Sequence, residues 1–260
     1  MLLLLALPLL AACGGSPTTV VDPAGGPTTS SLPPEQVVVR VYDGPGFTSA
    51  IFAGRTFATL TVLGDGRVFE QGPVPDIFPG PAVLPVLTGT LTSAQLAQVI
   101  ADIKQADLLR TVDYGRPPVS DAGTVDVSVD VDGHTWIHSA YALNIGSAEQ
   151  SPERRTLSAF IASVHKIVDP VATHAYEPMA LVATAWQAAP QPGQTPGPKV
   201  KPWSGATPLG TGSCQVVSDP ALVRELAGGT ETTLYRQGGT TYQLGLRPLL
   251  PGDKGCAPRG

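Results

Sequence analysis

Glycine and proline together supply more than a fifth of the 260 residues, whereas charged residues supply only 14%. A hydrophobic fraction of 42% is too high for a wholly disordered chain, and the residue pattern excludes a collagen, a coiled coil and a polytopic membrane protein. The net charge of −5 provides no basic footprint, so we expect no nucleic-acid partner. The composition favours one or two small folded units joined by proline-rich segments.

The first residues indicate export. Residues 2–10 are an apolar run too short to cross a bilayer, because a spanning helix needs about 20 residues. The run ends in Leu10-Ala11-Ala12-Cys13-Gly14, which resembles the lipobox of bacterial lipoproteins. The resemblance implies that residues 1–12 are a signal segment, and that a lipid on Cys13 anchors the protein to the extracytoplasmic face of the cell membrane. The membrane is therefore one expected partner.

The next segment, residues 13–35, reads as a flexible tether, because it is rich in Gly, Pro, Ser and Thr. An α+β domain is expected over 36–187. It starts with a hairpin within 57–70 that turns at Gly64-Asp65-Gly66. Thr92-Ser93-Ala94-Gln95 is a capping-box pattern, which predicts the start of a helix.

A second hairpin and a second helix follow. Residues 124–131 alternate valine with polar side chains, and Asp132-Gly133 predicts a turn into an antiparallel strand over 134–141. Ser151-Pro152 is typical of a helix start, with serine as the cap and proline in the first turn. The order of hairpin, helix, hairpin and helix predicts an α+β fold, with an antiparallel sheet and helices on one face.

A proline-rich strap at 188–202 separates this domain from a small C-terminal module, 203–260, for which we expect a helix and a hairpin. Cys214 and Cys256 lie in this module and form an even pair. In an exported chain such a pair predicts a disulfide, with two unrelated free thiols as the alternative. Two cysteines alone do not make a zinc site, so we expect no metal here and no other cofactor.

Several segments of the first domain resemble a bacterial family of secreted proteins and lipoproteins, a domain of unknown function. The similar segments are LTVLGDGRV (60–68), GTLTSAQLAQVI (89–100) and SDAGTVDVSVDVDG (120–133), within a region of about 55–170. The resemblance implies fold and compartment only, because the family has no established activity. The excess of 11 Arg over 5 Lys also looks like that of an actinobacterial lipoprotein.

Two sets of residues are candidates for a functional site. His134 and His138 lie on one predicted strand, and Asp126 and Asp130 lie on its partner. A one-residue bulge would bring the four together as a metal site, whereas a plain two-residue turn would put the histidines on the valine face, away from the aspartates.

The loop over 113–123 is the better candidate for binding. It carries Tyr114, Arg116 and Asp121, and exposed aromatic and arginine side chains are common interface anchors. The alternative is that Tyr114 covers a helix end and Asp121 caps a turn. The sequence favours a non-enzymatic binding or envelope-structural module that meets an envelope protein or a small ligand, with a metal-dependent envelope enzyme as the rival.

Overall fold

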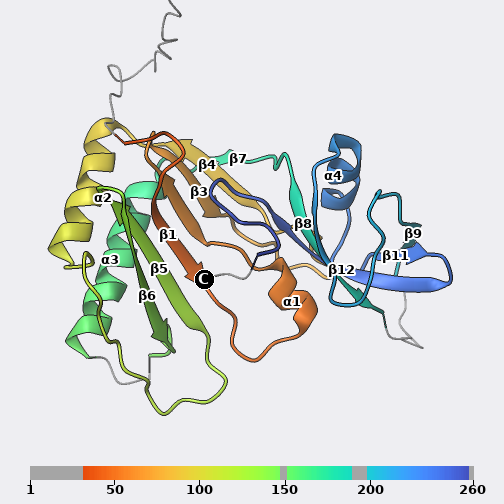
Figure 1. Ribbon diagram of the computed structural model, residues 1–260, viewed down its shortest axis with the longest axis horizontal. Coiled ribbons are helices and arrows are strands. Elements are labelled where there is room, and N and C mark those ends of the chain that lie inside the picture. The colour runs from red at the N-terminus through yellow and green to blue at the C-terminus, as the bar shows by residue number, and fades with distance from the viewer. Residues whose placement is uncertain (1–31, 147–150, 189–197, 258–260) are drawn as a thin grey trace, which may run out of the picture.

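The computed structural model describes residues 32–146, 151–188 and 198–257 (Figure 1). In this part of the chain, two mainly antiparallel sheets are accompanied by four helices, so the predicted α+β class is confirmed. None of these helices is both long and apolar enough to pass through a lipid bilayer.

The first sheet has seven strands, β1 (Val37–Asp43), β2 (Leu60–Leu63), β3 (Arg67–Gln71), β4 (Val86–Thr90), β5 (Thr124–Val131), β6 (His134–Tyr141) and β7 (His174–Ala175). Their order across the sheet is β6-β5-β1-β2-β3-β4-β7. Strand β1, which the sequence pattern does not predict, pairs with both β2 and β5 and so joins the two hairpins into one sheet.

Two helices, α2 (Ser93–Gln105) and α3 (Pro152–Val168), cover one face of this sheet (Figure 1). Thr92 and Gln95 form the reciprocal capping box, and the Ser151 side chain accepts from the backbone of Arg154. Such caps satisfy amide groups that the first helical turn leaves without partners. The buried faces of both helices pack on the valines of β5 and β1, which makes this the larger core.

The second sheet has five strands in the order β10-β8-β12-β11-β9. They are β8 (Leu181–Gln187), β9 (Val200–Pro202), β10 (Cys214–Val217), β11 (Leu234–Gln237) and β12 (Thr240–Pro248). Helix α4 (Pro220–Ala227) packs on this sheet through Leu222, Val223 and Leu226, which belong to a separate core cluster.

The expected domain boundary is therefore wrong for the sheets. From their position before the proline-rich strap, residues 181–187 are expected in the first domain. As β8, they lie inside the second sheet, between β10 and β12. The strap indicates where the chain leaves a strand, but it carries no information about which sheet contains that strand.

Helix α1 (Ala50–Arg55) connects the two sheets, because it follows β1 in the chain and packs against β12 and β8. The contact depends on two glycines. A Cβ on Gly245 would lie 2.8 Å from the Ile51 carbonyl oxygen and 3.0 Å from Cα of Gly54, so no larger residue fits there. The Arg55 guanidinium, at the end of α1, also forms a 2.5 Å ion pair with Glu231, which lies between α4 and β11.

Candidate functional site

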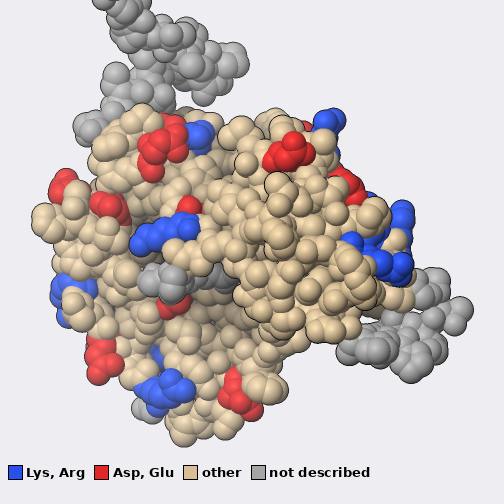
Figure 2. Space-filling view, turned by 45° about the vertical axis from the view of Figure 1, so that its right-hand side comes forward, with Lys and Arg blue, Asp and Glu red and all other residues tan. Residues whose placement is uncertain are grey.

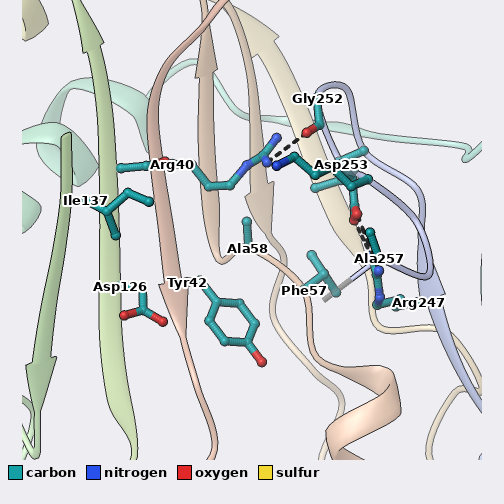
Figure 3. Close-up of a pocket in the computed structure, with 13 residues that line it drawn as sticks. Arg40, Tyr42, Phe57, Ala58, Asp126, Ile137, Arg247, Gly252, Asp253 and Ala257 are labelled. Atoms are coloured by element: carbon teal, nitrogen blue, oxygen red, sulfur yellow. Dashed lines mark hydrogen bonds and ion pairs between the residues drawn. The ribbon is translucent and has the colours of Figure 1, made fainter. Parts of the chain in front are cut away.

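A cleft lies on the face of the first sheet that α2 and α3 leave uncovered (Figure 3). Arg40 and Tyr42 of β1 form its floor, together with Asp126 of β5 and Ile137 of β6. The segment that follows β12 forms its opposite wall and includes the residues from Leu250 to Ala257. The cleft thus lies between the first strand of the fold and the segment that follows its last strand.

The alternation of side chains along the strands explains why polar groups gather here. Val39 and Val41 point into the helix-covered core, so Arg40 and Tyr42 point to the other face. The same rule places Asp126 and Ser128 on that face, because the valines of β5 are buried under the helices. The floor of the cleft is consequently polar, with Ile137 as its exposed apolar edge.

Arg40 is the positively charged side chain on the floor of the cleft. Its Nη1 donates to the Gly252 carbonyl at 3.0 Å and its Nη2 donates to the Pro251 carbonyl at 2.6 Å. These bonds use two of the five N–H donors of a guanidinium. Across the described residues Arg40 has no ion pair. Burial lowers the pKa of Arg40, while the nearby Asp253 carboxylate partly opposes this.

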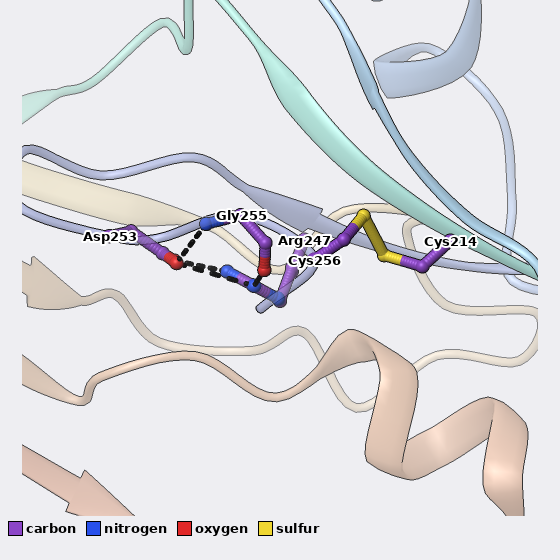
Figure 4. The surroundings of a disulfide bond; sticks show 5 residues. All are labelled: Cys214, Arg247, Asp253, Gly255 and Cys256. Carbon is purple, nitrogen blue, oxygen red and sulfur yellow. Dashed lines mark hydrogen bonds and ion pairs between the residues drawn. A yellow bond between two sulfur atoms is a disulfide. The ribbon is translucent and has the colours of Figure 1, made fainter. Parts of the chain in front are cut away.

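The wall of the cleft is held by a second arginine (Figure 4). Arg247 is buried and forms an ion pair with Asp253, and its Nη2 donates to the Gly255 carbonyl at 2.5 Å. The Asp253 carboxylate also accepts from the Gly255 amide at 2.9 Å. Asp253 thus forms its ion pair with Arg247, and it acts on Arg40 only through the longer-range attraction of its charge.

The predicted disulfide between Cys214 and Cys256 is confirmed, with a Cα–Cα distance of 5.7 Å. It connects the end of the wall to β10 at the edge of the second sheet (Figure 4). Leu250 anchors the other end of the wall by packing with Phe57 and Phe69 on the uncovered face of the first sheet. The wall of the cleft is therefore attached at both ends, by Leu250 and by the disulfide.

The volume of the cleft, about 140 Å³, suits a small ligand. An apolar cavity of about 150 Å³ holds a benzene-sized molecule. Arg40, Arg247 and Lys254 outnumber the two carboxylates of Asp126 and Asp253. Asp126 is further engaged by the Ser139 hydroxyl at 2.5 Å. A small anion with an apolar body matches this combination of excess positive charge and apolar edge.

Of the three candidate residues in the predicted binding loop, two are exposed and one is buried. Tyr114 is 4% exposed, so the expectation that it is an exposed anchor is wrong. Its hydroxyl is 2.9 Å from Nδ1 of His138, and burial raises its pKa to about 12. Arg116 is exposed and lies 4.0 Å from the ring centroid of Tyr141. Asp121 is exposed in a left-handed turn with φ of 57°, five positions after Arg116, and it does not line the cleft.

Of the two alternatives for the second hairpin, the structure shows the plain two-residue turn, so the four-residue metal site does not form. The pairing is regular, with Val127 opposite His138 and Val131 opposite His134, so no bulge is present. Asp126 and Asp130 pair with Ser139 and Thr135 and point to the other face of the sheet. The histidines and aspartates are consequently separated by the thickness of the sheet.

His138 is instead a buried structural group, and its titration predicts acid sensitivity. Burial lowers its pKa, and Nε2 lies 2.9 Å from the Leu108 carbonyl oxygen, which requires a proton on Nε2. With Nδ1 accepting from Tyr114, the folded state holds His138 neutral. Its contribution to stability is present above the unfolded-state pKa of about 6.5, and it is lost as pH falls through the lower folded-state pKa.

We therefore expect His138→Gln to flatten the pH dependence of the free energy of unfolding between about pH 7.5 and pH 5, measured by urea titration. His134→Gln is the matched control, because His134 is exposed on the same strand. An unchanged slope in His138→Gln would contradict this assignment.

Comparison with protein-family models finds no match to this chain, and no curated protein matches it either. Cys13 and the lipobox lie outside the described residues. Arg40 and Arg247 are not predictable as site residues, since two single arginines 207 positions apart have no local pattern that links them. The one available signal is the position of Arg40 in an otherwise apolar run, Val37–Val41.

Proposed function

We propose that this protein is a lipid-anchored, extracytoplasmic binding protein without catalytic activity, and that the Arg40 cleft binds its ligand. The observation that carries the proposal is Arg40 itself, whose guanidinium is held by the Pro251 and Gly252 carbonyls while no carboxylate forms an ion pair with it among the described residues. Because the guanidinium is already held in place, binding of an anion to it would cost little side-chain entropy.

The cellular location rests on two independent features. The lipobox around Cys13 supports attachment to the cell membrane, and the Cys214–Cys256 disulfide fits a compartment in which disulfides persist. We also propose that the chain contains a member of the secreted domain family of unknown function. Its shared unit would be the hairpin, helix, hairpin and helix within about 55–170.

The anchor is tested by metabolic labelling with a palmitate analogue. We expect the analogue to label the wild-type chain but not Cys13→Ser, because the thiol of Cys13 is the lipid acceptor in a lipobox. Equal labelling of both chains would contradict the lipid anchor, but it would not bear on the proposed ligand site in the cleft.

The ligand site is tested with benzoate as the probe and benzamide as its uncharged counterpart. We expect benzoate to bind the wild-type chain more tightly than benzamide by calorimetry, and Arg40→Met to lose the difference. Arg116→Met is the matched control, because Arg116 is exposed and contacts Tyr141 outside the cleft. Equal binding of both probes, or benzoate binding that survives in Arg40→Met, would contradict the site.

A further inference from the structure

A second group of chemically active side chains lies on the helix-covered side of the first sheet. It consists of Glu70 on β3, His165 on α3 and Asp169 at the end of that helix. Nδ1 of His165 is 2.6 Å from Oε1 of Glu70 and 3.6 Å from Oδ1 of Asp169. One nitrogen or oxygen atom from each residue lies within 4.8 Å of the other two.

The local structure explains how the three residues meet. His165 and Asp169 are four positions apart, so they lie on the same side of the final turns of α3. Val68 and Glu70 are two positions apart on β3, and Val68 belongs to the core under the helices. Glu70 therefore points toward α3, and its side chain is only 13% exposed.

The charges of this group do not balance. Two carboxylates face one imidazole, and no lysine or arginine in the described ranges forms an ion pair with either carboxylate. Burial raises the pKa of Glu70, and the like charge of Asp169 raises it further, while His165 opposes both. The two carboxylates beside one imidazole leave an excess of negative charge that a bound cation would balance.

We propose that Glu70, His165 and Asp169 bind a Zn²⁺ ion. The ion supplies two positive charges against the two carboxylates, and His165 binds it in its neutral form through Nδ1. One nitrogen and two oxygen ligands leave a fourth tetrahedral position for water. Ca²⁺ and Mg²⁺ fit less well, because they prefer sets of oxygen ligands, whereas imidazole favours transition metals.

The distances are compatible with this ion. Zn–N and Zn–O bonds of about 2.0–2.2 Å in a tetrahedron place neighbouring ligand atoms about 3.3–3.6 Å apart. The 3.6 Å separation of His165 and Asp169 fits this range, and the 2.6 Å separation of His165 and Glu70 is a hydrogen bond that must lengthen when the ion replaces the shared proton. Asp169 is mostly exposed, so its side chain can rotate toward the ion without a change in the backbone. Binding would connect β3 to the end of α3.

The test uses the full chain carrying Cys13→Ser, titrated with Zn²⁺ by calorimetry and with Co²⁺ by absorption spectroscopy. We expect one Zn²⁺ per chain, and a visible spectrum typical of Co²⁺ with four ligands. His165→Ala and the nearly isosteric Glu70→Gln should each weaken binding by about tenfold or more, at least the loss typical of changes around a metal ligand. Binding should also weaken as pH falls, because protons compete for the ligands.

His134→Ala is the matched control, since it removes an exposed histidine from another part of the same sheet and should bind Zn²⁺ as the parent does. Arg40→Met should do so too, which separates this site from the cleft. The absence of a stoichiometric site in the parent, or equal affinity in folded His165→Ala and Glu70→Gln, would overturn the proposal.

Discussion

Arg247→Ala is expected to lower the free energy of unfolding by about 3–5 kcal/mol, the usual cost of breaking a buried ion pair by removing one partner. Arg247 is 3% exposed and bonds both the Asp253 carboxylate and the Gly255 carbonyl. Its removal leaves the Gly255 carbonyl without the arginine donor and takes the balancing charge from the Asp253 carboxylate, which keeps only the bond from the Gly255 amide among the bonds of this segment. Urea unfolding followed by circular dichroism measures the loss.

Two further variants separate charge from packing. Asp253→Asn retains an oxygen that can accept from the Gly255 amide, so its loss should be smaller than that of Arg247→Ala. The double variant Arg247→Met with Asp253→Leu replaces the pair by apolar groups, and such replacements are often neutral. A loss below about 1 kcal/mol in Arg247→Ala, the value of an exposed pair, would show that this ion pair does not hold the segment.

The double variant Cys214→Ser/Cys256→Ser is expected to lose about 4 kcal/mol according to the chain-entropy model of a disulfide. The two cysteines are 42 positions apart, and the loop that they close contains α4, β11 and β12. Urea unfolding with and without a reductant measures the effect. Both cysteines are exposed, so a reductant can reach the bond.

The control uses the reductant on the double variant itself, in the Cys13→Ser background. There the reductant should have no effect, because no thiol or disulfide remains. Limited proteolysis gives a second measurement, in which reduction of the intact pair should expose 249–257 to cleavage. Protection of that segment that is unchanged on reduction would contradict the role assigned to the disulfide.

The two losses should not add. Arg247 and the disulfide both hold the segment 247–256 in place. Once one of the two attachments is removed, this segment is less ordered, so removal of the other costs less free energy. Neighbouring sites with shared partners commonly couple by about 0.5–3 kcal/mol. The triple variant is therefore expected to lose less than the sum of the separate losses.

Local signals in the sequence predict local structure well. The valine alternation at 124–131 has the bounds of β5, and Thr92 caps α2 where the capping-box pattern places it. These signals depend on neighbours within a few residues. Side-chain alternation also predicts that His138 lies on the valine face when the turn has two residues, as the structure shows.

The sites depend on contacts that no local pattern contains. Arg40 meets Gly252 across 212 positions, and Glu70 meets His165 across 95. Tyr114 has the composition of an interface anchor, but its hydroxyl finds His138 and becomes buried. Residues 181–187 look like the end of one domain because strand patterns do not identify the partner strand, which here is β12.

The position of β12 determines when the protein can finish folding. It pairs with β8 on one side and β11 on the other, so the middle of the second sheet is missing until residues 240–248 are available. Leu250, which packs on the uncovered face of the first sheet, arrives later still. During synthesis from the N-terminus, β8 can pair with β10 on one side, but its other edge stays unpaired until nearly the whole chain has emerged. Such nascent chains are prone to aggregation and depend on chaperones.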